Sequence, residues 1–215
     1  MQTILREQQQ EISRIQNNQK QHETFTKMQG NKMKNILMID IETTGQNPGC
    51  RVLTIGAFGF DKEGNQVQFY KRLDAIKMHA EGFQDEVSTM DWWTKQSNQA
   101  FVEAFGGQDD PQESIGAFKT FLYENFKMGS KDCFQVWCNG LDFDFPILKE
   151  FCKHYGFYMP WKYWDQYDYR TIKNIFPIVK AAEQNAGAHN ALEDAKAQMR
   201  GLRDFFKRAE SGALT

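Results

Sequence analysis

The segment that most constrains the fold is NILMIDIETTG, residues 35–45, where two carboxylates appear in the most apolar part of the chain. Residues Asn35–Ile41 have the composition of a buried β-strand, and Asp40 and Glu42 stand two positions apart at its end. Side chains two positions apart in a strand point to the same face of the sheet. Burying two neighbouring carboxylates is costly unless a cation lies between them. The segment therefore predicts a cation site at the end of a buried strand.

Further strands are expected on both sides of the helical middle of the chain. Val52–Phe60 and Asn65–Leu73 have strand patterns, and the sequence DKEGN between them is typical of a hairpin turn. A fourth strand is expected at Phe134–Asn139. Together with the helices described next, these strands predict an α/β fold with a mixed sheet of about five strands flanked by helices.

Helical patterns occupy most of the remaining chain. Residues 85–101 have helical character with Ser88 as the cap, and the sequence GGQDD that begins at residue 106 is a loop. Pro111 begins a helix that runs to Phe126, Pro146 begins another, and a last helix follows His189. The residues expected to face inward from these three helices are Ile115, Phe118, Leu122, Leu148, Phe151, Cys152, Leu192, Ala195, Met199, Leu202 and Phe206.

Composition indicates one globular domain preceded by a polar leader. The chain has 215 residues, of which 40% are hydrophobic and 14% aromatic, enough to bury a core of ordinary size. Residues 1–34 are rich in Gln and Asn and offer few apolar positions, so we expect a helical or disordered leader. The folded domain is then expected at residues 35–210.

Charge and cysteine usage limit the class of protein. The net charge of −2 argues against a protein that coats long duplexes by neutralising phosphates, although bound metal ions would reverse the local sign at a strand end. No apolar run approaches the roughly 20 residues of a membrane span, and the N-terminus lacks the plan of a secretory signal. The four cysteines form no CxxC pair. We therefore expect a cytoplasmic protein with no membrane association.

Two more acidic residues and a histidine stand at the ends of expected elements. Asp144 lies just past the fourth strand, and Asp194 lies one turn into the last helix, five residues after His189. Taken singly, Asp144 is more easily explained as a helix cap, Asp194 as a polar residue on a helix face, and His189 as a surface residue. The small residues NAGA before His189 suggest a mobile loop.

Three motifs occur in order along the chain: DIETTG at 40–45, NGLDFDFPIL at 139–148 and HNALED at 189–194. Together they resemble the motifs of the DEDDh superfamily of 3′→5′ exonucleases, with RNase T, oligoribonuclease and polymerase proofreading subunits among its members. The sequences STMDWWTKQS, VWCNGLDFDFPIL and WKYWDQYDYRTI are similar to the phage exodeoxyribonuclease A group and its RNase T-like bacterial relatives. The resemblance extends from about Asn35 to Phe206 and implies an RNase H-like fold.

The resemblance also implies the roles of the acidic residues. Asp40, Glu42, Asp144 and Asp194 would be metal ligands and His189 the general base. In the second motif Asp144 is preferred to Asp142, because the family aspartate follows Phe and precedes a pair of apolar residues. Carboxylate oxygens select hard cations such as Mg²⁺ or Mn²⁺. Two such ions, roughly 3.5–4 Å apart, would clamp the attacking and leaving oxygens of a phosphodiester.

Substrate contacts are expected from residues near these motifs. Thr43, Thr44 and Gly45 would place backbone N–H groups near the terminal 3′-hydroxyl. Bases of a single strand would stack on aromatic rings for about 1–3 kcal/mol each. The aromatic candidates are Trp92, Trp93, Phe143 and Phe145, with at most one tryptophan of the pair expected to meet a base and both in the core as the alternative. Arg170 and Lys173 are candidates for phosphate contacts, and both could equally be solvated.

The expected function is a metal-dependent 3′→5′ exonuclease that releases nucleoside 5′-monophosphates from single-stranded DNA ends. A 3′→5′ exoribonuclease is the alternative, because the groups that would sense a 2′-hydroxyl cannot be identified from the sequence. A catalytically idle module that binds nucleic-acid ends, or a metal-stabilised structural domain, is less favoured because no carboxylate is missing. Homodimer formation stays open.

Overall fold

The computed structural model describes residues 33–128, 134–183 and 189–213. The chain divides into two units after Lys34, and Asn35 is the first residue of the unit that contains the sheet. Residues 1–32 lie outside the described residues, and so do Cys133 and the NAGA segment, so the expectations for them stay predictions. Within the described part of the chain, no helix is long and apolar enough to cross a membrane.

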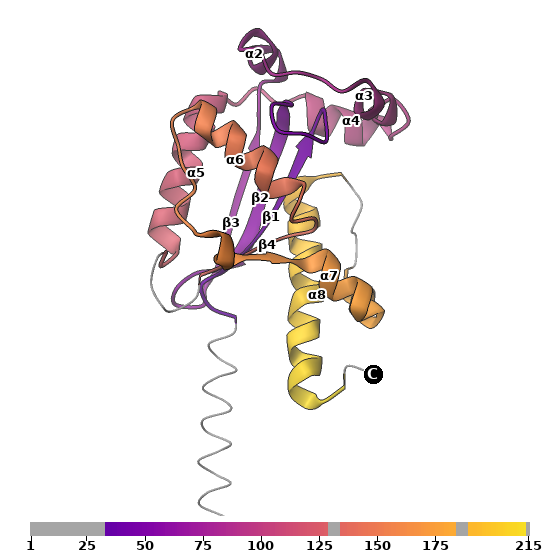
Figure 1. Cartoon of the computed structure of the whole chain (residues 1–215). Coiled ribbons are helices and arrows are strands. Elements are labelled where there is room, and N and C mark those ends of the chain that lie inside the picture. Colours follow the sequence, from indigo (N-terminus) through magenta and orange to yellow (C-terminus); the bar gives the residue numbers. More distant parts are fainter. Residues whose placement is uncertain (1–32, 129–133, 184–188, 214–215) are drawn as a thin grey trace, which may run out of the picture. The chain divides into compact units, whose positions relative to one another are not determined.

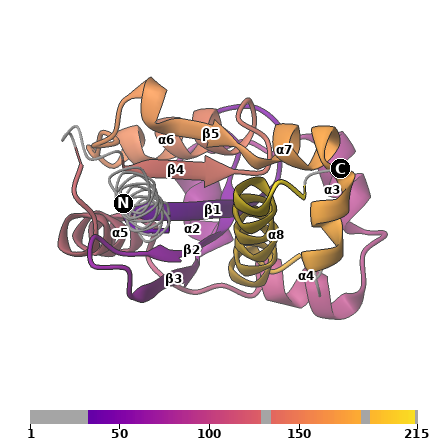
Figure 2. The same cartoon turned by 90° about the horizontal axis from the view of Figure 1, so that it is seen from below.

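Five strands form one mixed sheet in the order β3-β2-β1-β4-β5 (Figure 2). Their bounds are Ile36–Thr43 for β1, Val52–Phe60 for β2, Gln66–Arg72 for β3, Gln135–Cys138 for β4 and Gln166–Asp168 for β5. β1, β2 and β3 are antiparallel neighbours, whereas β4 runs parallel to β1 and β5 parallel to β4. The hairpin between β2 and β3 and the mixed sheet expected from the sequence are therefore confirmed, and β5 is the strand that the sequence pattern did not predict.

Helices cover the sheet and gather at one end of it (Figure 1). Their bounds are Ala75–Ala80 for α2, Val87–Trp93 for α3, Asn98–Phe105 for α4, Pro111–Asn125 for α5, Asp144–His154 for α6, Tyr169–Ile175 for α7 and Ala191–Ser211 for α8, with short 3₁₀ helices at Tyr163–Asp165 (η1) and Pro177–Ala182 (η2). α2, α3 and α4 lie at the end toward which β1 points, and α7 lies beside α8 (Figure 1).

The alternation of β1 determines what lies on each face of the sheet. Leu37, Ile39 and Ile41 enter the main core together with inward residues of α5 and α6. Asp40 and Glu42 point to the other face, where α8 packs on β1 and β2. The expected inner residues of α5, α6 and α8 are buried, except that Phe206 is only half-buried.

The helix expected at residues 85–101 is wrong, because the structure has two helices there. Ser88 caps neither of them: Glu86 occupies the N-cap of α3, and Ser97 caps α4 by accepting a hydrogen bond from the backbone of Ala100. The Thr94 hydroxyl donates to the carbonyl of Asp91 at the end of α3. Such local bonds from Ser and Thr compete with helix continuation, and they separate α3 from α4.

The helix α6 begins at Asp144 and not at Pro146 as expected. The backbone N–H groups of Phe143 and Asp144 both donate to the carbonyl of Gly140, which starts the helical turn earlier. Proline is tolerated in the first turn because its missing N–H needs no partner there. The earlier start places the Asp144 carboxylate at the first turn of α6, beside the end of β1.

Candidate active site

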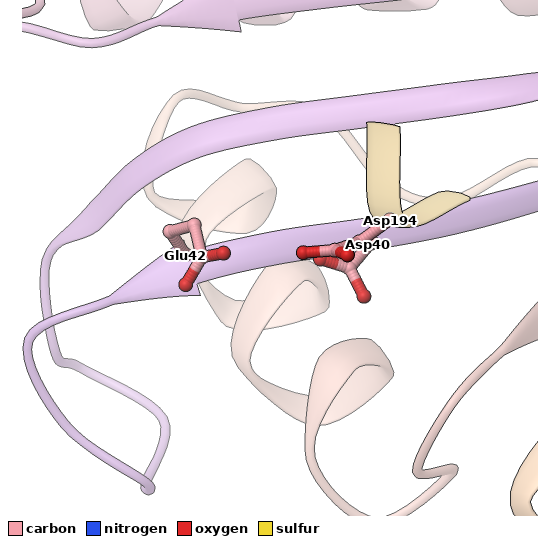
Figure 3. A group of neighbouring side chains, drawn as sticks. All are labelled: Asp40, Glu42 and Asp194. Atoms are coloured by element: carbon pink, nitrogen blue, oxygen red, sulfur yellow. The ribbon is translucent and has the colours of Figure 1, made fainter. Parts of the chain in front are cut away.

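Three carboxylates from two elements meet at the end of β1 (Figure 3). Asp40 and Glu42 come from β1, Asp194 comes from the first turn of α8, and one oxygen of each lies within 4.8 Å of the others. The close approach of α8 to the sheet depends on Gly56 in β2, which is the pairing partner of Asp40 in β1. A β-carbon at Gly56 would lie 2.2 Å from the backbone carbon of Ala191, so only glycine allows α8 to lie this close. The structure therefore brings together three of the four predicted acidic residues.

Asp144 lies beside this cluster without belonging to the group of three. Its side chain is 3% exposed, and burial raises its pKa to about 7. The backbone of Ile41, the charge of Arg170 and the thiol of Cys138 act in the opposite direction and lower that pKa. β4 pairs with β1 only as far as Met38. Beyond that point, the Asp144 carboxylate accepts a hydrogen bond from the backbone of Ile41. Asp142, by contrast, is exposed, in agreement with the choice of Asp144.

The pKa values of the cluster show that its carboxylates repel one another. Burial raises the pKa of Glu42 to about 8, with further contributions from the charges of Asp194 and Asp144. Burial also raises the pKa of Asp40 well above its usual value, and the charges of Asp144, Glu42 and Asp194 add to the effect. A bound divalent cation would remove this repulsion, so the arrangement suits a cation site with oxygen ligands.

Protonation of Glu42 and Asp144 gives the metal-free protein a distinctive pH dependence. Both pKa values are higher in the folded chain than in the unfolded chain, so the stability from their protonation is complete below about pH 4 and is lost as pH rises to about 8. In the presence of a chelator, we expect the melting temperature to fall between about pH 5.5 and pH 8.5. The fall should be roughly 2–4 °C for each kcal/mol of unfolding free energy that is lost. Calorimetry of wild type and Glu42→Gln tests this, because the melting temperature of the variant should fall less over this pH range. Equal falls in the two proteins would contradict the raised pKa of Glu42.

The ring of His189 lies against the tryptophan pair of α3. Its centroid is 4.9 Å from that of Trp92 and 6.1 Å from that of Trp93, both in edge-on arrangements. The backbone of His189 has a φ of 50°, in the left-handed region. Trp93 is 1% exposed and donates from Nε1 to the carbonyl of Thr43 at 2.8 Å, whereas Trp92 is 41% exposed. The pair thus connects the end of β1 to the histidine, with Trp93 as the core residue.

Asn190 holds the start of α8 to the sheet. Its Oδ1 accepts hydrogen bonds from two backbone N–H groups in the first turn of α8. Its Nδ2 donates to the hydroxyl of Tyr70 on β3 at 3.1 Å and to Glu103 on α4 at 2.9 Å, and Tyr70 itself donates to Glu103 at 2.7 Å. One side chain therefore caps the helix that carries Asp194 and ties it to two other elements.

A pocket of about 330 Å³ opens beside the carboxylates. It is lined by Glu42, Thr43, Gly45, Trp92, Trp93 and Phe143, together with polar residues at the start of α3. This volume is within the range of small-ligand sites and is bordered by aromatic rings next to the acidic cluster. Five of the nine candidate substrate residues therefore line one pocket: Thr43, Gly45, Trp92, Trp93 and Phe143.

The other predicted substrate contacts have structural partners. The N–H of Thr44 donates to the carbonyl of Arg51 at 3.0 Å, and its contact with substrate stays a prediction. Arg170 donates from Nη2 to the carbonyl of Asn139 at 2.7 Å, which holds the turn that follows β4. Lys173 lies 3.9 Å from a carboxylate oxygen of Glu183.

Phe145, the remaining aromatic candidate, is 4% exposed and packs in the main core. The start of α6 at Asp144 explains this position, because Phe145 is the second residue of the helix and its side chain points into the core. Phe143, which precedes the helix, is left as the ring of this motif that reaches the pocket.

Sequence reasoning missed two polar residues that support the site, Asn190 and Gln198. Gln198 interrupts the apolar stripe of α8 one turn after Asp194, and its Nε2 donates to Oδ1 of Asp40 at 2.7 Å. That polar interruption was the available signal, because positions four apart on a helix share a face. For Asn190 the signal was its place directly before the first helical residue.

Comparison with known proteins assigns these features to one class. Over 187 residues, which are 73% of this chain and 82% of the relative, the sequence is 27% identical to the exodeoxyribonuclease of Enterobacteria phage T4. The crystal structure of cell-death related nuclease 4 (CRN-4) is similar with a TM-score of 0.53 at 14% identity, covering 80% of this chain and 63% of CRN-4. E. coli Exonuclease I with a dA16 oligonucleotide has a TM-score of 0.54 at 15% identity, covering 83% of this chain and 41% of that chain.

The chain spans less than two thirds of either structural neighbour, and at these identities the likeness shows a shared fold. The mixed sheet, the acidic cluster and the sequence relatives together define a DEDD-type 3′–5′ exonuclease with an RNase H-like fold. Within that class, the chain belongs to the 3′-5′ exoribonuclease Rv2179c-like domain family, which matches residues 35–205. The fold class, the exonuclease resemblance and the assignment as an enzyme are thereby confirmed.

Proposed function

We propose that the protein is a divalent-metal-dependent exonuclease that removes nucleoside 5′-monophosphates one at a time from the 3′ ends of single-stranded DNA. The observation that carries this proposal is the meeting of Asp40, Glu42 and Asp194 within 4.8 Å, beside a pocket bordered by Trp92 and Phe143. A cluster of like charges next to an aromatic pocket suits a phosphate and its attached base, provided that cations neutralise the carboxylates.

The donor set fits hard cations. Its groups are carboxylates only, which favour Mg²⁺ or Mn²⁺ over zinc, and their raised pKa values mark a site that is unfavourable without a cation. Asp40, Glu42 and Asp194 would hold the ions, with Asp144 as the fourth ligand of a pair of ions. When bound, such ions screen the phosphate charge, stabilise the leaving oxygen and acidify water.

The protein residues then orient the strand end and move a proton. Trp92 and Phe143 would stack the terminal bases, and the backbone at Thr43 and Gly45 would contact the terminal sugar. An imidazole nitrogen of His189 would accept the proton of the attacking water. The water oxygen bonds to phosphorus while the bond to the 3′ oxygen of the preceding nucleotide breaks, so the phosphate leaves on the released nucleotide.

The substrate strand could be DNA or RNA, and a separate observation favours each. DNA is proposed first, because the curated relative is named an exodeoxyribonuclease. RNA is the second candidate, because the matching family is described as an exoribonuclease domain. The distinction rests on whether the pocket accepts or rejects a 2′-hydroxyl.

Matched oligonucleotides test the proposal. Single-stranded DNA and RNA of one sequence, labelled at the 5′ end, should be shortened from the 3′ end with Mg²⁺ or Mn²⁺ and left intact in a chelator. The released nucleotides, which carry no label and are followed by their absorbance, should co-migrate with nucleoside 5′-monophosphates on chromatography, and the ratio of the two rates identifies the preferred strand. Release of 3′-monophosphates or cleavage inside a circular strand would contradict the proposal, and binding without shortening would favour an idle end-binding module.

A further inference from the structure

Gln198 forms a partly buried side-chain hydrogen bond with Asp40, a member of the acidic cluster. It lies on α8 one turn after Asp194, is 5% exposed, and donates from Nε2 to Oδ1 of Asp40 at 2.7 Å. Its other polar atom, Oε1, is buried and has no hydrogen-bond partner among the described residues. The two bonded residues are 158 positions apart in the sequence, so the contact exists only in the folded domain.

A buried amide with only one of its two polar atoms hydrogen-bonded is unfavourable if the side chain serves only to pack the core. An unpaired buried polar atom costs about 1–3 kcal/mol, and an apolar side chain of the same length would avoid that cost. Apart from Asp194 one turn earlier, the neighbours of Gln198 on the inner face of α8 include Ala195, Met199 and Leu202, which are apolar and buried. An amide at this position is therefore better explained by its bond to Asp40 than by packing.

We propose that Gln198 is a positioning residue that fixes the orientation of the Asp40 carboxylate and thereby sets the affinity of the acidic cluster for divalent cations. The inference rests on the proposed function, because it assumes that the cluster holds metal. A neutral donor suits this role, because it restrains the carboxylate without cancelling the charge that a cation needs. A lysine at the same place would instead compete with the cation.

Binding measurements on Gln198→Met test the proposal. Methionine keeps the length of the side chain and removes both polar atoms, so the metal-free protein should melt at the wild-type temperature or above it. Titration calorimetry with Mn²⁺ alone, without nucleic acid, should show affinity weakened by about 10–100-fold, the usual effect of losing a partner of a metal ligand. The loss of hydrolysis rate should be larger at low Mn²⁺ than at saturating Mn²⁺. Gln112→Met, an exposed position on α5, is the matched control.

A double-mutant cycle separates positioning from a general effect on folding. In an Asp40→Ala background, where Gln198 has no carboxylate to orient and the remaining carboxylates bind Mn²⁺ more weakly, Gln198→Met should cause no further loss of Mn²⁺ affinity. Wild-type affinity in Gln198→Met would overturn the inference, and so would failure of both Gln198→Met and Gln198→Leu to fold. If wild type itself binds no Mn²⁺, the proposed function fails, which is a different result.

Discussion

Replacing Asp40 by asparagine is expected to abolish measurable hydrolysis of oligonucleotides and to reduce the metal-dependent rise in melting temperature. Asparagine keeps an oxygen that can accept the bond from Gln198, so the local packing is retained while the charge is lost. Cations that stabilise transition-state charge supply several kcal/mol, and about 4 kcal/mol corresponds to a ~10³-fold loss of rate. The measurement is the initial rate on a single-stranded oligonucleotide, with melting curves taken with and without Mn²⁺.

The same substitution should leave the metal-free fold intact or make it more stable near pH 8. Asp40 is buried among the charges of Asp144, Glu42 and Asp194, and removing one of four repelling groups relieves the others. Asp142→Asn, an exposed position in the same motif as Asp144, is the matched control and should keep full activity. Comparable rates for Asp40→Asn and wild type would mean that hydrolysis occurs elsewhere or comes from a contaminant.

Periodic and local patterns predicted most of the scaffold of this site. The strands β1, β2 and β3 and the inward residues of α5 were predictable because alternation and helical spacing are written along the chain. The division between α3 and α4 was not, because it depends on hydroxyl-to-backbone bonds at Thr94 and Ser97 that do not alter the hydrophobic pattern.

The acidic residues could be named from motifs, but the contacts that support them could not. The bond of Gln198 to Asp40 and that of Asn190 to Tyr70 join residues 158 and 120 positions apart. Neither has a local signature strong enough to identify its partner. For Arg170, the charge suggested a phosphate contact, which stays a prediction, and nothing in the sequence indicated that its guanidinium also holds the turn after β4. Sequence reasoning thus identified the chemical groups, while their supports came from tertiary packing.

Gly56→Ala is expected to damage both the stability and the activity of the protein. The added β-carbon would lie 2.2 Å from backbone atoms of Ala191 and Leu192, and backbone cannot rotate away as a flexible side chain can. Overpacking of this kind costs about 1–3 kcal/mol or more, so we expect the melting temperature to fall by roughly 5–10 °C. Because α8 carries Asp194, its displacement of about 1 Å would reduce the rate by about 10²-fold even at saturating metal.

Gly116→Ala is the matched control, because it makes the same chemical change at a glycine with open space around it. Gly116 lies inside α5, and no neighbouring atom of the described chain lies within 4 Å of the position of an added β-carbon. Alanine is favoured over glycine in a helix by about 0.5–1 kcal/mol, so this variant should melt slightly higher and hydrolyse at the wild-type rate. Melting curves and rates for the two variants separate the general effect of losing a glycine from the effect at β2. Full activity in Gly56→Ala would contradict this prediction. It would show that the spacing between α8 and β2 does not control the position of Asp194 relative to Asp40 and Glu42.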